Sequence, residues 1–130
     1  MTIAVDTSAI VAMIKGEPEE ERLRTRLARE NVALMSTGNI LELQLVAAGA
    51  RSLATWPDVE KLLETYRIIA HPFDERQLNI AREAAMRFGK GRHEARLNFG
   101  DCFAYALAKS EDIPLLCTGG DFAKTDVALA

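Results

Sequence analysis

Four acidic residues stand where carboxylates could act together: Asp6, Glu42, Asp101 and Asp121. Taken singly, Asp6 fits an Asx-turn or helix cap, and Glu42 fits a core salt bridge with an arginine or a polar helix edge. Asp101 fits a weak capping box with Asn98, and Asp121 fits a solvated turn. Gathered at one site, the carboxylates would repel each other strongly unless a cation lay among them. Oxygen ligands without histidine suit Mg²⁺ or Mn²⁺, so the set predicts metal-assisted hydrolysis of phosphodiester bonds.

Short apolar runs that alternate with helical patterns would bring these acids together. The pattern predicts strands at 3–5, 32–35, 68–70 and 114–117, and helices at 7–14, 17–27, 36–46, 57–66, 74–88 and 98–108. This alternation is typical of an α/β protein with a parallel sheet covered on both faces. Ligands of such sheets bind beyond the carboxyl ends of the strands, and Asp6 and Asp121 lie at or just past two of these ends.

Length and composition restrict the class of protein. The 130 residues suit one domain, taken as residues 1–130, and 48% hydrophobic with 27% charged residues is the balance of a soluble globular protein. The first residues lack the basic region of a signal peptide, and no apolar stretch approaches the roughly 18 residues of a membrane span. Cys102 and Cys117 form no C-x-x-C pair, so we expect two free thiols in the cytoplasm and no zinc site.

Five segments, in order along the chain, carry a resemblance to a known family: Val5–Ala9, Ser36–Val46, Gly89–His93, Leu97–Lys109 and Gly119–Asp126. With Asp6, Glu42, Asp101 and Asp121 inside them, the chain resembles the PIN-domain family, specifically the VapC-type toxin ribonucleases. The resemblance implies a three-layer α/β/α fold with a short, mostly parallel central sheet. It also implies an Mg²⁺-dependent endoribonuclease, with Mn²⁺ as a substitute, that a cognate VapB-type antitoxin inactivates. We further expect a homodimer.

The resemblance also implies roles for individual residues. Asp6 and Asp101 correspond to the primary metal ligands, and Glu42 and Asp121 complete the acidic cluster directly or through waters. Ser8 would support the turn after the first strand. Relatives often carry an acid at the position of Gly120, and Asp126 could compensate for its absence. In the implied mechanism the metal lowers the pKa of a bound water, whose hydroxide displaces the ribose 3′ oxygen without a histidine base.

The net charge of −3, from 16 basic and 19 acidic residues, argues against binding nucleic acid by bulk charge. The four acids account for its sign, because without them 16 basic residues would face 15 acidic ones. A local positive excess remains between Arg76 and Arg96, where six basic residues accompany two acidic ones. There, a glycine-flanked loop carries Lys90, Arg92 and His93, which we expect to contact RNA phosphates. Three aromatic residues are expected in the core instead of stacking on bases: Phe99, Phe103 and Phe122.

Two other functions are compatible with the sequence. One is a catalytically weak PIN-like module that binds RNA or a protein partner without cutting. The other is a small Mg²⁺ phosphohydrolase that acts on nucleotides. The presence of all four acids favours the ribonuclease.

Overall fold

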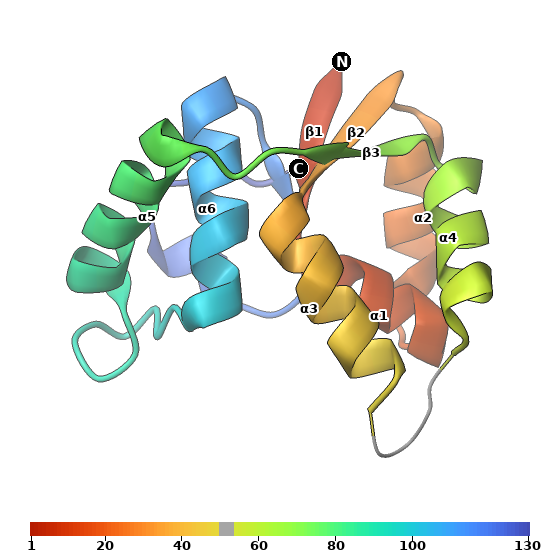
Figure 1. Ribbon diagram of the computed structural model, residues 1–130, viewed down its shortest axis with the longest axis horizontal. Coiled ribbons are helices and arrows are strands. Elements are labelled where there is room, and N and C mark those ends of the chain that lie inside the picture. The colour runs from red at the N-terminus through yellow and green to blue at the C-terminus, as the bar shows by residue number, and fades with distance from the viewer. Residues whose placement is uncertain (50–53) are drawn as a thin grey trace.

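A single parallel sheet organises the part of the chain that the computed structural model describes, residues 1–49 and 54–130. Its strands have the order β3-β2-β1-β4, and every ladder between them is parallel. Their bounds are β1 Thr2–Val5, β2 Val32–Ser36, β3 Ile68–His71 and β4 Leu115–Leu116. All four strands lie where the apolar runs predict them, so the expected parallel sheet is confirmed (Figure 1).

The helices connect these strands, and most of them begin at a side-chain cap, although α2 has none. They are α1 Thr7–Lys15, α2 Glu20–Ala28, α3 Thr37–Ala47, α4 Trp56–Thr65, α5 Glu75–Phe88 and α6 Phe99–Glu111, with a short 3-10 helix at Phe122–Lys124. The side chains of Ser36, Asp74 and Asn98 cap α3, α5 and α6 respectively. The helix predicted from Glu17 begins at Glu20, because Pro18 lies in the turn before it. None of these helices is long and apolar enough to span a bilayer.

Helices cover both faces of the sheet, and the alternation of side chains along the strands explains why. In β1, Ile3 and Val5 pack into one core with residues of α1, α2, α3 and α4, whereas Ala4 faces a second core with residues of α5 and α6. Figure 1 shows α5 and α6 on one side of the sheet and α1, α2 and α4 on the other. The three-layer α/β/α architecture expected from the resemblance is therefore confirmed.

Candidate active site

Asp6 lies at the carboxyl end of β1, where the chain turns into α1. Its Oδ2 accepts a 3.0 Å hydrogen bond from the backbone N–H of Ser8, which makes Asp6 the N-cap of α1. Only 3% of the residue is exposed. The simple interpretation of Asp6 as a cap therefore holds, and the same geometry fixes its carboxylate at the edge where parallel sheets bind ligands.

Asp101 lies in the first turn of α6 and takes part in a capping box. Its Oδ2 accepts a 3.0 Å hydrogen bond from the N–H of Asn98, whose own Oδ1 accepts a 2.9 Å bond from the N–H of Asp101. The box engages only one of the two carboxylate oxygens of this half-buried residue. Capping and metal binding by Asp101 are therefore compatible.

Glu42 lies half-buried on α3, against the beginning of α6. Its Oε1 accepts a 3.2 Å hydrogen bond from Nδ2 of Asn39, and its carboxylate lies against the Cα atom of Gly100. None of the described arginines forms an ion pair with Glu42. Within the described residues, the alternative of a core salt bridge is therefore wrong, and the carboxylate faces the beginning of α6 instead.

The charges of these acids act on one another, which means that their carboxylates lie near each other. Burial raises the pKa of Asp6 to about 6 despite the lowering effect of its hydrogen bonds with Ser8, and the charges of Asp101 and Glu42 raise it further. Burial also raises the pKa of Asp101, against its hydrogen bond with Asn98, and the charges of Glu42 and Asp121 add to the rise. The structure thus brings together carboxylates from β1, α3, α6 and the segment after β4.

The loop after β4 is tied to the turn after β1. Ser8 Oγ accepts a 3.1 Å hydrogen bond from the backbone N–H of Thr118, and the N–H of Asp6 donates to the carbonyl of Leu116 at 2.9 Å. Asp121 follows this loop and is exposed. Ser8 therefore joins the two chain segments that carry Asp6 and Asp121.

The structure places Asp126 away from these contacts. Its Oδ1 accepts a 2.5 Å hydrogen bond from the hydroxyl of Tyr105, and its Oδ2 lies 3.4 Å from Lys109 Nζ and 3.5 Å from an Arg87 guanidinium nitrogen. The carboxylate is thus shared among one hydroxyl and two cations on α5 and α6. These contacts favour a tether of the C-terminal segment over the expected support of the metal site.

The acidic cluster fits a hard divalent cation that keeps much of its water. In residues 1–49 and 54–130, no three His, Cys, Asp or Glu side chains are grouped closely enough to hold an ion by themselves. Mg²⁺ ordinarily takes one or two protein carboxylates and several waters, so such an open arrangement suits it. Burial is the main cause of the raised pKa of Asp6 and Asp101, and the charges of the neighbouring acids add to it; a bound cation would offset both effects.

The basic loop is closed at its base, beside the beginning of α6. The N–H of Lys90 donates to the carbonyl of Leu97 at 3.0 Å, and the N–H of Leu97 donates to the carbonyl of Phe88 at 2.9 Å. Lys90 and Arg92 are exposed, whereas His93 packs edge-on against the Phe88 ring at 5.1 Å. The Nδ1 atom of His93 also accepts a 3.0 Å bond from the N–H of Ala95. The two cations are thus accessible to a ligand, and His93 helps to shape the loop.

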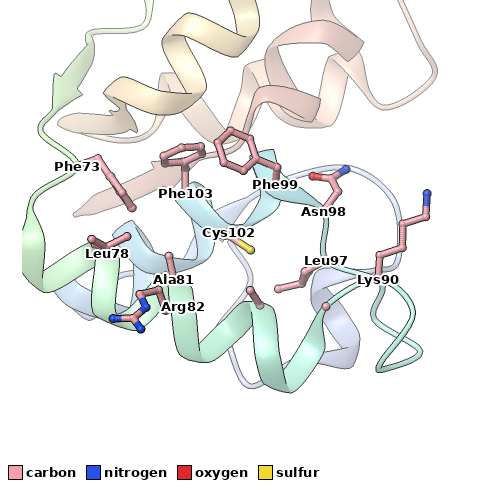
Figure 2. A pocket seen from close by; sticks show the side chains of 12 residues that line it. Phe73, Leu78, Ala81, Arg82, Lys90, Leu97, Asn98, Phe99, Cys102 and Phe103 are labelled. Carbon is pink, nitrogen blue, oxygen red and sulfur yellow. The ribbon is translucent and has the colours of Figure 1, made fainter.

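An apolar groove of about 520 Å³ runs between α5 and α6 beside this loop (Figure 2). Phe73, Phe99 and Phe103 line it in edge-to-face contact, with ring centroids 4.6 Å apart for the Phe73–Phe103 pair and 5.0 Å apart for the Phe99–Phe103 pair. Phe99 is 82% exposed, so its expected place in the core is wrong. It occupies the first position of α6, where its neighbour Asn98 is the cap and no core lies beneath it.

The positions of three residues near the acids are not among those expected from the sequence: Asn39, Gly100 and Phe99. Asn39 is fully buried on α3, three positions before Glu42, and that spacing places both on one helix face. Gly100 allows the Glu42 carboxylate to approach α6. An amide one turn before an acid in an apolar helix is the available signal for Asn39, whereas nothing local distinguishes Gly100 or Phe99.

The chain is similar to known proteins over nearly its whole length. The PIN domain family model matches residues 3–128. Ribonuclease VapC30 of Mycobacterium tuberculosis is 40% identical over 132 residues, which cover 97% of this chain and 96% of the relative. Ribonuclease VapC of Mycolicibacterium smegmatis is 42% identical over 132 residues, which cover 97% of this chain and 98% of the relative.

Two solved structures share the fold. Mycobacterium tuberculosis VapC20, a sarcin-ricin loop cleaving toxin, has a TM-score of 0.77 at 17% identity, with 98% of both chains covered. A toxin–antitoxin complex from Klebsiella pneumoniae has a TM-score of 0.72 at 14% identity, with 98% of this chain and 96% of the other covered. These identities show the fold alone. The family model and the two ribonuclease relatives show more, namely that the chain belongs to the PIN-domain family and, within it, to the VapC ribonucleases.

Proposed function

We propose that this chain is the endoribonuclease toxin of a toxin–antitoxin pair, hydrolysing RNA phosphodiester bonds at an acidic site that takes Mg²⁺, or Mn²⁺ as a substitute. The observation that carries the proposal is the convergence of Asp6, Glu42 and Asp101 from three separate elements, with the pKa of Asp6 raised to about 6. The ribonuclease relatives support it, because their likeness covers nearly the whole of both chains.

Asp6 and Asp101 are the main ligands in this proposal, with Glu42 and Asp121 as direct or water-mediated partners. A divalent ion bound there supplies a water of lowered pKa and neutralises charge on the scissile phosphate. The chain itself holds Asp6 and Asp101 in place before substrate arrives, because each carboxylate accepts a backbone hydrogen bond. The two histidines have structural contacts elsewhere, in keeping with a reaction that needs no imidazole base.

Lys90 and Arg92 are the proposed contacts for RNA phosphates flanking the cleavage position. The loop that carries them ends at Asn98, the cap of the helix that begins with the Asp101 turn. Both side chains are exposed. They therefore offer positive charge next to an acidic site that would otherwise repel RNA. His93 would act through the loop shape, since its ring and Nδ1 are engaged.

A VapB-type antitoxin and a second copy of the chain are the proposed protein partners. The toxin–antitoxin complex named above shares the fold. In addition, α3 carries large apolar side chains that are exposed to solvent: Leu41 is 60% exposed and Leu45 is 67% exposed. Neighbouring exposed apolar residues on one helix favour a protein contact. We assign this face of α3 to a homodimer and place the protein's action in the cytoplasm, where its RNA would be.

The test is cleavage of a structured RNA with millimolar Mg²⁺ and then with excess EDTA. Asp6→Asn and Asp101→Asn should each abolish cleavage while leaving the chain folded. Asp112→Asn is a matched control, because Asp112 caps the opposite end of α6 in a left-handed conformation that asparagine tolerates. Cleavage that persists in EDTA or in either site variant would exclude this mechanism.

The same assay separates the two alternatives. RNA binding without cleavage by the wild-type protein would indicate a binding module. Hydrolysis of free nucleotides, with RNA left intact, would indicate a small phosphohydrolase.

A further inference from the structure

We propose that Asn39 is the positioning residue that fixes Glu42 relative to two of the other acids, Asp6 and Asp101. The inference rests on the proposed ribonuclease function and adds a residue to it. Asn39 has no exposed surface and lies on α3 one turn before Glu42. It contacts Glu42 itself and the immediate neighbours of those two acids.

Two of these contacts come from the side-chain amide. Nδ2 of Asn39 donates to Glu42 Oε1 at 3.2 Å and to the carbonyl oxygen of Gly100 at 2.9 Å. Because both partners are acceptors, only the amino group of the amide satisfies them, and this settles its orientation. Gly100 directly precedes Asp101, so one NH₂ group connects α3 to the turn of α6 that carries Asp101.

The third contact comes from the backbone of Asn39. Its carbonyl oxygen accepts a 3.3 Å hydrogen bond from the hydroxyl of Thr7, the residue that directly follows Asp6. Thr7 is itself buried. Asn39 thereby connects the β1–α1 turn, α3 and α6, the three elements that supply Asp6, Glu42 and Asp101.

Within the described part of the chain, an unpaired polar atom at Asn39 lowers stability, and this indicates that the residue has a role other than packing. Oδ1 of Asn39 is buried with no hydrogen-bond partner among the described residues. An unpaired buried acceptor ordinarily lowers stability, and an apolar residue of similar volume would avoid that penalty. A leucine at position 39 could fill the space, but it could not hold the carboxylate of Glu42 or the turn of Asp101.

The experiment compares Asn39→Leu with Gln77→Leu, a matched change in a second buried amide. Gln77 lies on α5, is 1% exposed, has an unpartnered Oε1 among the described residues and contacts His71, outside the acidic site. At a temperature where both variants are folded, Asn39→Leu should lower kcat for RNA cleavage by about tenfold or more with little change in KM. It should also reduce the Mg²⁺-induced rise in melting temperature measured without RNA. Gln77→Leu should keep the wild-type kcat and Mg²⁺ response.

A double-mutant cycle with Glu42→Gln decides whether Asn39 acts through Glu42. If it does, Asn39→Leu should cause little further decrease of kcat in the Glu42→Gln background. The proposal is overturned if the two effects multiply in full, or if Asn39→Leu reduces activity no more than Gln77→Leu does. If Asn39→Leu does not fold, Asn39→Ser, which retains one donor, enters the same cycle with the same criteria. Failure of the wild-type protein to cleave RNA would instead refute the proposed function.

Discussion

Gly100 lies so close to the carboxylate of Glu42 that any side chain at position 100 would overlap it. A Cβ atom placed there would be 2.6 Å from Glu42 Cδ and 2.7 Å from Oε1. The same two helices also meet at Gly38, where a Cβ atom would be 2.7 Å from Phe103 Cγ. Two glycines, one on each helix, thus allow α3 and α6 to approach closely, and only Gly100 makes room for the carboxylate of Glu42.

Gly100→Ala should reduce RNA cleavage without unfolding the protein. Alanine favours the helical conformation at this position, and the obstructing group is the flexible end of a side chain. The carboxylate of Glu42 would therefore move away from Asp101 while α6 persists. We expect kcat to fall by about tenfold or more, with an unchanged circular dichroism spectrum. A folded Gly100→Ala variant with wild-type kcat would show that the position of Glu42 does not matter.

Gly38→Ala should have the opposite pattern, a decrease in stability with activity kept in the folded fraction. Its Cβ would meet the Phe103 ring, which is held between Phe73 and Phe99 and cannot turn aside easily. Overpacking of this kind costs about 1–3 kcal/mol, measurable as a lower free energy of unfolding in urea. Unchanged stability would mean that α3 and α6 can separate more readily than the ring contacts suggest.

Much of the fold can be predicted because its signals are local. Short apolar runs locate each strand, and Ser36, Asp74 and Asn98 locate the beginnings of three helices. Parallel pairing then follows from the alternation of strands and helices, and it brings the carboxyl ends to one edge. This is why the convergence of Asp6 and Asp101 with Glu42 can be expected from sequence.

The remaining features depend on contacts between distant segments. Phe99 has the pattern of a core residue because it begins an apolar helix, but its place before the first full turn leaves it in solvent. Asp126 is expected from sequence to assist the metal site, yet it follows the 3-10 helix and meets Tyr105 instead. Asn39 contacts Thr7 and Gly100, which are separated from it by 32 and 61 positions in the chain, so no local pattern reveals these contacts.

The raised pKa of Asp6 predicts that stability without metal falls as pH rises. A carboxyl whose pKa is 3.8 in the unfolded chain and about 6 when folded binds more protons in the folded state between these values. The free energy of unfolding should therefore decrease by up to about 3 kcal/mol in total as pH rises from about 3 to about 7, and by about 2 kcal/mol of that between pH 4 and pH 6. Asp6→Asn keeps the helix cap and removes the charge. The variant should therefore be more stable than the wild-type protein at pH 7 and no more stable than it below pH 4. Equal urea midpoints for the wild-type protein and Asp6→Asn at pH 7 would contradict this prediction.

Asp126→Asn tests whether the C-terminal tether and the acidic site are separate. Burial alone would raise the pKa of Asp126, but the Tyr105 hydroxyl and the charges of Lys109 and Arg87 lower it. Its contribution to stability should thus be present at neutral pH and disappear as pH falls through that lowered pKa. We expect Asp126→Asn to cost about 1 kcal/mol at pH 7 and to leave RNA cleavage intact. Tyr105→Phe should lower the free energy of unfolding by a similar amount. An Asp126→Asn variant that is folded but inactive would instead indicate that Asp126 supports the metal site.

Lys90→Gln and Arg92→Gln should weaken RNA binding through charge alone. Each substitution removes one positive charge from the loop, so KM should rise while kcat stays near the wild-type value. On single-stranded RNA, the slope of log affinity against log salt concentration should become shallower by about 0.7 for each phosphate that the variant no longer neutralises. Lys61→Gln on α4 is a suitable control, because this residue belongs to the other helical layer. His93→Ala should instead destabilise the loop, because the ring would no longer pack against Phe88. A salt slope unchanged in both loop variants would mean that RNA reaches the acidic site by a path that avoids the loop.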